Sequence, residues 1–303
     1  MGNMTDTLAT IPAETLRTRR LSVRHCTRYT YDRPVRRSSH ELHLRPIDDW
    51  QQTVLGYRLH VSPAVQLIEY EDVFGNWAGR FSVAEPYTEL TIAAESQVQL
   101  LDVDPFAFAK LPIQPSFPLV WMPWERMMLA PYLTPEELPV AQLQEIYQYA
   151  MGFVERNNRD LMETLFAINL TLFREYQYMP GSTGLHTTAY QVMTRRAGVC
   201  QDFANLFICM ARMLGIPARY VCGYMYTGTG ASRARSDSSH AWVQLYIPHI
   251  GWKGFDPTNG VLPQTNHIRV GYGRHYRDTA PTSGTIFTPA VEKMSVEVQV
   301  TEA

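Results

Sequence analysis

Cysteine is scarce in this sequence: the 303 residues include only four, and no two of them form a Cys-x-x-Cys pair. A small disulfide-stabilised protein needs a denser cysteine framework, and structural zinc sites usually draw on closely spaced pairs. We therefore expect reduced thiols and neither a metal nor another cofactor. A zinc site built from cysteine and histidine is an alternative that these spacings disfavour. The four cysteines are Cys26, Cys200, Cys209 and Cys222.

Long apolar runs and an excess of one charge are also missing. No segment supplies the roughly 20 consecutive apolar residues of a membrane-spanning helix, and the N-terminal stretch contains no apolar core of a signal peptide. The formal net charge is -2, which offers no basic surface to nucleic acid or to an anionic membrane. These absences predict a cytoplasmic protein that binds neither nucleic acid nor membrane.

Zones of different composition follow one another along the chain. Residues 19–104 contain short runs of period two broken by turn residues, which predicts a β-rich, sandwich-like domain. Residues 105–139 hold eight prolines among aromatic residues and are expected to form a connector without regular helix. Residues 140–303 are expected to form the second domain, and residues 1–18 a flexible tail.

The pattern turns helical after residue 140, around 142–155 and again around 161–176. A third helix is predicted to begin at Cys200, because apolar residues recur there every three or four positions and Gly215 and Pro217 end the run. Near the C-terminus, the alternation over 291–300 predicts a strand that joins either a sheet of the second domain or the edge of the β-rich domain. The stripe of the third helix consists of Phe203, Leu206, Phe207, Met210, Met213 and Leu214.

Cys200 occupies the first turn of this predicted helix, at the edge of the buried stripe. Unpaired backbone N–H groups and the positive end of the helix dipole favour a thiolate there, which is the nucleophilic form of cysteine. The alternative interpretation is a small core residue. Cys209 lies about half a turn around the same helix and cannot share a metal or a disulfide with Cys200. Cys26, Cys209 and Cys222 are expected to be packing residues.

A nucleophilic cysteine needs a base, and the base needs a carboxylate that orients it. The segment SHAWVQLYI alternates as a strand, with His240 and Trp242 on one face. A turn at 248–251 leads into a second strand that ends at Asp256. If the hairpin is centred on residue 248, His240 and Asp256 lie opposite each other, about 5 Å apart at Cβ. The alternative is a surface histidine and an unrelated turn aspartate.

These motifs together resemble the bacterial transglutaminase-like proteins of the papain-like cysteine enzyme superfamily. The resemblance rests on GVCQDFA with Arg212, GIPARYVCGY, SHAW and GWKGFDPTNG, which occur in this order. The preceding β-rich stretch also resembles the N-terminal region that accompanies this core. The fold implied is α+β: a β-rich, sandwich-like domain, then a core with helices packed on an antiparallel sheet. Two positions depart from the pattern, with His275 in place of Asp in GRDY and Asn205 in place of His in DFAH.

The resemblance implies that Cys200 is the nucleophile, His240 the general base and acid, and Asp256 the orienting carboxylate. The expected substrate is an amide bond of a peptide or protein, and the expected intermediate is a thioester resolved by water or by a second amine. Hydrolysis by a cysteine peptidase or amidohydrolase is the favoured reaction. Transamidation of protein glutamine is the alternative, and a catalytically silent interaction module on the same fold is a further one.

The oxyanion of the tetrahedral intermediate needs hydrogen-bond donors. The Cys200 backbone N–H is expected to be one of them. The resemblance implies an aromatic donor upstream of the cysteine, for which we expect the Tyr178 hydroxyl, although Tyr176 is equally near in the sequence. Trp242, on the same strand face as His240, is expected to wall the cleft and keep water from the ion pair.

Overall fold

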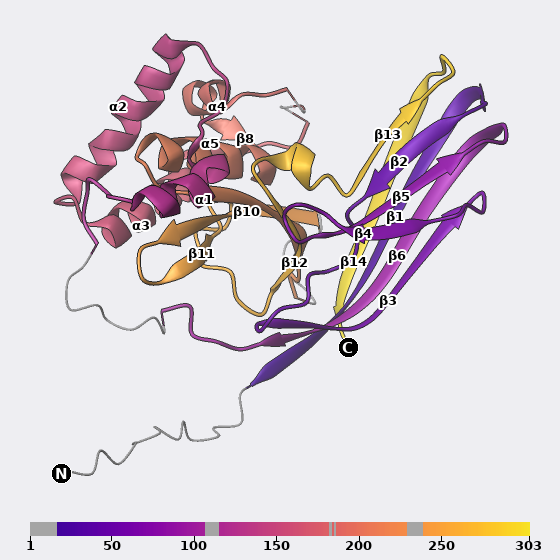
Figure 1. Cartoon of the computed structure of the whole chain (residues 1–303), viewed down its shortest axis with the longest axis horizontal. Helices are drawn as coiled ribbons and strands as arrows, with labels where there is room; N and C mark the ends of the chain where they lie inside the picture. The colour runs from indigo at the N-terminus through magenta and orange to yellow at the C-terminus, as the bar shows by residue number, and fades with distance from the viewer. Residues whose placement is uncertain (1–16, 107–114, 182–183, 185, 229–238) are drawn as a thin grey trace.

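The structure is a computed structural model that describes residues 17–106, 115–181, 184, 186–228 and 239–303. Figure 1 shows two parts side by side, a helical part with its own sheet and a part made of long strands. No helix in the described part of the chain is long and apolar enough to cross a membrane. The predicted tail, residues 1–18, lies outside the described residues except at its end, where the first strand starts at Thr18.

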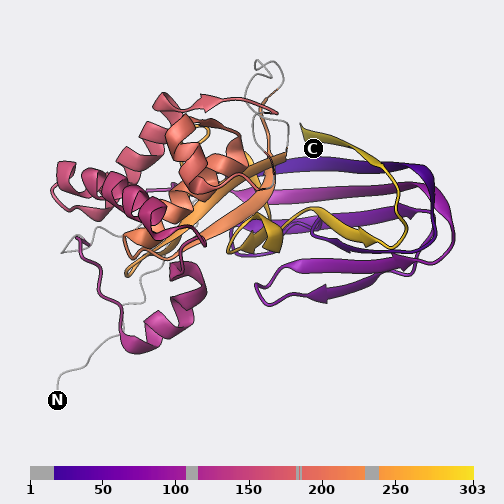
Figure 2. The same cartoon turned by 90° about the horizontal axis from the view of Figure 1, so that it is seen from above.

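The β-rich part is a sandwich of two antiparallel four-stranded sheets, as the alternating sequence predicts (Figure 2). One sheet has the strand order β14-β1-β6-β3, and the other has the order β13-β2-β5-β4. Tyr29 and Ile92 from the first sheet pack with Leu42 and Phe81 from the second in one buried cluster. The strands are β1 Thr18–Val35, β2 Ser38–Leu42, β3 Gln52–Ser62, β4 Ile68–Glu71, β5 Trp77–Val83, β6 Tyr87–Leu101, β13 Thr282–Ile286 and β14 Glu292–Glu302.

The two C-terminal strands belong to the sandwich, which corrects the expected boundary of the catalytic domain at residues 140–303. β14 pairs antiparallel with β1, from Glu302 opposite Leu21 to Glu292 opposite Tyr31. β13 pairs in the same way with β2. An alternating strand can extend any sheet whose edge is open and whose inner face matches its apolar side. Of the two positions that the sequence left open, β14 occupies the sandwich edge.

The helical part packs its helices against an antiparallel sheet of order β11-β10-β9-β12. Leu206 and Phe207 of α5 lie in one buried cluster with Val243 and Leu245 of β10. The helices predicted around 142–155 and 161–176 are α2 and α3. The elements are α1 Pro123–Leu133, α2 Val140–Arg156, α3 Leu161–Glu175, β7 Gln177–Tyr178, α4 Ala189–Arg195, β8 Ala197–Gly198, α5 Cys200–Met213, β9 Ala218–Met225, β10 Ser239–Ile247, β11 Gly251–Phe255, β12 His267–Gly273 and the 3-10 turn η1 Tyr276–Asp278.

The proline-rich connector contains a regular helix, α1, which corrects the expectation of an irregular segment. Pro123 stands in the first turn, where its missing N–H costs no helical hydrogen bond. The Glu125 side chain accepts a hydrogen bond from the Met122 backbone N–H at 2.9 Å and so secures the helix start. Pro131 lies near the other end. No residue of α1 is buried, so this helix lies on the surface.

A further apolar cluster joins the two parts of the molecule. Gln52 adds polar contacts at the same junction, because its side chain donates to the carbonyl oxygen of Arg269 at 2.8 Å and accepts from the Arg269 backbone N–H at 2.8 Å. The sheet of order β11-β10-β9-β12 is thus fixed against the sandwich. The cluster consists of Leu21, Val23, Val98 and Leu100 from the sandwich and Tyr224, Tyr226, Ile268 and Val270 from the sheet side.

Candidate active site

Cys200 is the first residue of α5, as the sequence predicts. Asp202 secures this helix start, because its carboxylate accepts a hydrogen bond from the Val199 backbone N–H at 2.8 Å. The Asp202 side chain packs directly against the backbone of Gly198. A larger residue would not fit there, since a Cβ at Gly198 would lie 2.8 Å from the Cβ of Asp202. Cys200 itself is half-buried against the edge of the core. The residue therefore combines a well-defined position with partial access from outside.

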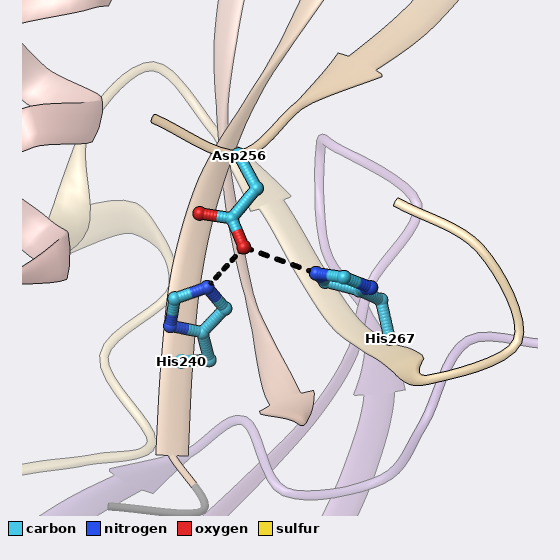
Figure 3. Close-up of side chains that lie close together, drawn as sticks. All are labelled: His240, Asp256 and His267. Atoms are coloured by element: carbon cyan, nitrogen blue, oxygen red, sulfur yellow. Dashed lines mark hydrogen bonds and ion pairs between the residues drawn. The ribbon is translucent and has the colours of Figure 1, made fainter. Parts of the chain in front are cut away.

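His240 and Asp256 form a buried pair. Nε2 of His240 donates to Oδ2 of Asp256 at 2.8 Å (Figure 3). Both side chains are fully buried. Since a carboxylate can only accept, Nε2 carries the proton and Nδ1 is the nitrogen left for another partner. The two residues that the sequence places on one face are brought together.

The hairpin that carries the pair has a register different from the expected one. Ile247 pairs with Gly251, so the midpoint is residue 249 rather than 248. The longer turn includes His249 in the left-handed region, at a φ of 63°. Asp256 is therefore two positions short of the residue that would lie opposite His240. A shift by two keeps every side chain on its original face, so the two side chains still meet diagonally.

The Asp256 carboxylate is the centre of the site. Oδ1 accepts from the backbone N–H groups of Thr258 and Asn259 at 2.9 and 3.2 Å. Oδ2 accepts from His240, from Nε2 of His267 at 3.1 Å and from Nδ2 of Asn259 at 2.7 Å. Burial alone would raise the pKa of Asp256, but the charge and hydrogen bond of His240, together with the hydrogen bond from His267, hold it well below its usual range. Asp256 is therefore ionised at neutral pH.

The imidazole of His240 lies between this carboxylate and the thiol of Cys200. Burial alone would lower the pKa of His240, but the charge and hydrogen bond of Asp256, with a smaller contribution from Cys200, raise it to about 10. Nδ1 has no partner of regular hydrogen-bond geometry among the described residues. Cys200 nevertheless lies close enough to act on the ring. Asp256 thus holds one nitrogen of the ring, and Cys200 lies close enough to the ring to raise its pKa.

His267 and Asn259 are members of this site that the sequence interpretation missed. His267 starts β12, and burial lowers its pKa although Asp256 opposes the effect, so the ring is neutral and donates through Nε2. Asn259 lies in the turn after Asp256 and binds the same carboxylate through its side chain and its backbone. Asparagine is common in turns, and a single histidine at the start of a strand does not indicate a functional site. The sequence therefore offers no reason to place either residue in the site.

Trp242 covers the pair, as the sequence predicts. Its ring stacks on His240 with the centroids 5.8 Å apart at 29°, and it meets His267 edge-on at 5.2 Å. Gly223, opposite His240 on β9, makes room for this arrangement. A Cβ at Gly223 would overlap the carbonyl oxygen of Ile268 and lie 2.7 Å from the Trp242 ring. The wall beside the imidazole therefore depends on a residue without a side chain.

The two tyrosines considered as oxyanion donors have different surroundings. Tyr176 is 5% exposed and belongs to the apolar core. Tyr178 is half-buried in β7, which pairs in parallel with β8 so that Tyr178 lies beside Gly198, two residues before Cys200. The ring of Tyr178 meets Phe203 edge-on at 6.4 Å. Position and exposure therefore favour Tyr178 over Tyr176 as the side-chain donor to the oxyanion. The role of Tyr178 as that donor stays a prediction.

The other cysteines lie in different surroundings from Cys200. Cys209 and Cys222 are buried, and burial raises the pKa of each to about 12. Cys26 is half-buried in β1 of the sandwich. All four cysteines are free thiols. The packing role expected for Cys209 and Cys222 agrees with their burial.

His240, Asp256 and His267 also offer a donor set suited to a metal ion, because their ligand atoms lie within 4.8 Å of one another. Their contacts have another complete explanation, however. The two nitrogens lie 2.8 and 3.1 Å from Oδ2, which are ordinary hydrogen-bond lengths. In both contacts an imidazole N–H donates to the carboxylate oxygen. The geometry therefore fits a hydrogen-bond network better than a metal centre.

Two family models match the chain. The bacterial transglutaminase-like N-terminal region matches residues 21–99, which is most of the sandwich from β1 to β6. The transglutaminase-like superfamily matches residues 147–257, from α2 to the residue after Asp256. Both matches agree with the fold expected from the sequence motifs.

Comparisons with relatives and with a solved structure agree with these family matches. An uncharacterized protein of Mycobacterium leprae is 31% identical over 284 residues, which cover 93% of this chain and 98% of the relative. The protein-glutamine gamma-glutamyltransferase of Pseudomonas aeruginosa is 31% identical over 93 residues, 29% of this chain and 14% of that protein. The crystal structure of a provisionally assigned cysteine protease from Cytophaga hutchinsonii has the same fold, with a TM-score of 0.72, 23% identity and coverage of 95% and 92% of the two chains. This chain therefore belongs to the transglutaminase-like superfamily and carries the bacterial transglutaminase-like N-terminal region before its core.

Proposed function

We propose that this protein is a cysteine hydrolase that cleaves amide bonds in peptides or proteins. Cys200 is the nucleophile, His240 transfers protons, and Asp256 orients and charges the imidazole. The observation that supports this most is one buried imidazole held by a carboxylate at 2.8 Å and adjoined by a cysteine at a helix start. The cytoplasmic location expected from the sequence stays a prediction.

The raised pKa of His240, about 10, means that its imidazole carries a proton at neutral pH. A cationic imidazole beside a cysteine is the arrangement that activates the sulfur as a nucleophile. The sulfur of Cys200 attacks the amide carbon, and the carbonyl electrons move onto oxygen. When this oxyanion collapses, the C–N bond breaks and the nitrogen leaves with the proton of His240, which gives a thioester and a neutral imidazole. Water then attacks the thioester carbon while His240 takes a proton from it. The second tetrahedral intermediate collapses, the C–S bond breaks, the acyl group leaves as a carboxylic acid, and Cys200 and His240 return to their starting states.

The oxyanion is stabilised in this scheme by the N-terminus of α5. The backbone N–H of Cys200 is one of those that a helix start leaves without an intrahelical partner. Tyr178 is the second donor in the proposal, since β7 runs beside the residues that lead to Cys200. Removing one such donor usually lowers kcat by about 100- to 1000-fold.

Transamidation is the second candidate, and one relative favours it. The Pseudomonas aeruginosa protein that matches part of this chain is a protein-glutamine gamma-glutamyltransferase. In that case the acyl group would come from a glutamine side chain, and a primary amine would take the place of water in the second step. The first half of the reaction would use the same three residues.

A peptide screen separates these reactions. The purified protein and its Cys200→Ala variant are incubated with a peptide library, with and without methylamine, and the products are read by mass spectrometry. Hydrolysis predicts cleaved or deamidated peptides that form without methylamine and disappear in the variant. Methylamine adducts on glutamine would assign a transamidase instead. Products that persist in the variant, or no product under either condition, would contradict both and favour an interaction module.

His267 is predicted to be a positioning residue for Asp256. His267→Ala removes one of the donors to the carboxylate, so the carboxylate holds His240 less firmly and kcat falls by about tenfold while KM stays unchanged. His267→Gln retains an N–H donor and is expected to recover most of the loss. Both are measured as kcat and KM on a peptide from the screen and as the alkylation rate of Cys200.

The matched control is His275→Ala, which removes a half-exposed histidine whose ring lies 3.9 Å from Asp278. It is expected to leave kcat unchanged. Equal losses for His267→Ala and His267→Gln at unchanged thermal stability would show that the hydrogen bond to Asp256 is not what matters.

A further inference from the structure

A cavity of about 340 Å³ lies between the catalytic sheet and the sandwich. Asp49 and the end of β6 line it from the sandwich side, and Arg219, Gln244 and Trp252 line it from the sheet side. Arg219 pairs with Gln244 across β9 and β10, while the neighbouring Val243 points into the core under α5. The cavity therefore lies on the sheet face turned away from α5.

The cavity adjoins the proposed site through His267, which lines it and also donates to Asp256, but the cavity does not reach the three proposed catalytic residues. Neither Cys200 nor His240 is among the described residues that line it. Gln244 lies four residues beyond His240 on the same strand, which corresponds to about 13 Å at 3.3 Å per residue. Trp242 stands between them, stacks on His240 and also lines the cavity. A ligand held near Gln244 would therefore lie away from the reacting sulfur.

Arg219 is held in a fixed orientation at the wall of the cavity. Its guanidinium carbon lies 3.7 Å from the ring centroid of Tyr272 and 4.4 Å from that of Trp252. Its Nε donates to the side-chain oxygen of Gln244 at 2.8 Å. Cation–π contacts on two rings and one hydrogen bond preorganise the group, which leaves the terminal nitrogens to bind a partner.

The charge of Arg219 lacks a carboxylate partner. No Asp or Glu of the described residues lies within ion-pair distance of it, whereas the other cavity arginine, Arg269, pairs with Asp49 at 2.7 Å. Burial lowers the pKa of Arg219, which reflects the cost of keeping this charge from water. An anion beside the guanidinium would offset that cost.

Further lining residues carry polar atoms without partners. Nε1 of Trp242 and Nε of Arg269 are buried N–H groups that no hydrogen bond between described residues satisfies. Buried donors are normally paired, with protein, water or a ligand. Because these two groups are enclosed, an acceptor oxygen of an occupant would bind the Arg219 guanidinium rather than either of them. Aromatic rings, including those of Trp50 and Trp252, form other parts of the wall and suit an apolar body.

We propose that this cavity binds a small organic monocarboxylate, with its carboxylate on Arg219 and its apolar body against the aromatic wall. A single negative charge is preferred, because the three cations of the lining, Arg219, Arg269 and Lys253, exceed the two carboxylates, Asp49 and Asp104, by one positive charge. The ligand would contact both parts of the chain at once. The proposal does not depend on the reaction at Cys200.

Calorimetry on the full chain at low salt tests the proposal with acetate, benzoate and phenylacetate. We expect phenylacetate to bind most tightly, and its neutral isostere phenylacetamide to bind at least about tenfold more weakly. Arg219→Gln is expected to weaken phenylacetate binding by about 10- to 100-fold. The matched control Arg28→Gln removes an exposed arginine of β1 that pairs with Glu89, and it should bind as the unmodified chain does.

The outcomes separate the alternatives. Binding of none of the carboxylates, equal binding of phenylacetamide, or unchanged binding by Arg219→Gln would overturn the proposal. Inorganic phosphate bound as tightly as phenylacetate would overturn the ligand class. If Arg219→Gln has a lower thermal midpoint or altered circular dichroism, Arg219→Lys keeps the charge without the planar fork and should still weaken binding. Unchanged binding by the lysine variant would then count against the site.

Discussion

Iodoacetamide at pH 6 is expected to alkylate Cys200 about 10- to 100-fold faster than any other cysteine of the folded chain. His240 carries a proton at this pH, because its pKa is raised to about 10. A cationic imidazole beside a cysteine makes the sulfur reactive. Burial raises the pKa of Cys209 and of Cys222 to about 12 and shields both from the reagent. Peptide mapping by mass spectrometry over a time course gives the four rates.

His240→Ala is the decisive companion variant, because it removes the imidazolium and leaves the helix start of Cys200 in place. The rate at Cys200 should fall to that of an ordinary half-buried thiol such as Cys26. Trp242→Phe serves as the control, since it keeps a ring on His240 and changes no charge. Equal rates for Cys200 and Cys26 in the unmodified chain would contradict an activated nucleophile and favour a catalytically silent module.

The helix that carries Cys200 was predictable because its signal is local. Apolar residues at helical spacing can be recognised within one short stretch of sequence, and together they define one face of the helix. Tertiary packing then buries that face. Phe203, Leu206, Phe207 and Met210 are each at most 2% exposed. The position of Cys200 at the helix start follows from the same boundary. Local periodicity thus places the sulfur on its element, although not relative to the imidazole.

The hairpin shows which part of a strand pairing is robust. Its exact register depends on the conformation of the turn residues, and His249 at a positive φ is not an expected choice there. Side chains alternate between the two faces of a strand, so a pairing shifted by an even number of residues leaves each side chain on the same face. His240 and Asp256 therefore meet even though the expected pairing was wrong by two residues.

The remaining contacts at Asp256 depend on how a loop folds back. The chain turns after Asp256, with Gly260 at a φ of 67° and a bridge from Asp256 to Val261, before β12 returns His267 to the same carboxylate. No periodic pattern spans such a turn. The pairing of β14 with β1 could not be predicted from the sequence for a similar reason, because it depends on which sheet leaves an edge strand open.

Asp256→Asn is expected to lower turnover by about 10,000-fold, the size of the effect that the same change has in serine protease triads. The amide offers one acceptor oxygen where the carboxylate satisfies several donors, and its NH2 group would face an N–H of His240 or His267. The loss of charge also removes the main cause of the raised pKa of His240. The rate is measured on a peptide from the screen, and the alkylation preference of Cys200 should disappear with it.

The same variant should lose about 3 to 5 kcal/mol of unfolding free energy near pH 5, as expected when one partner of a buried ion pair is removed. The pKa of Asp256 is depressed, so its contribution is present above about pH 4 and is lost in acid. The pKa of His240 is raised, so its contribution is full below about pH 6.5 and is lost as the pH rises through about 10. The difference between the two proteins should therefore be largest between about pH 4 and 6.5 and shrink in alkali.

Urea denaturation of both proteins at pH 5 and at pH 10 measures this difference. Asp160→Asn is the matched control, because Asp160 caps α3 and asparagine caps a helix nearly as well. It should change little at either pH. A deficit in Asp256→Asn that is the same at pH 5 and pH 10 would mean that the carboxylate acts through neutral hydrogen bonds alone. In that case the charged pair of His240 and Asp256, and with it the activation of Cys200, would have to be abandoned.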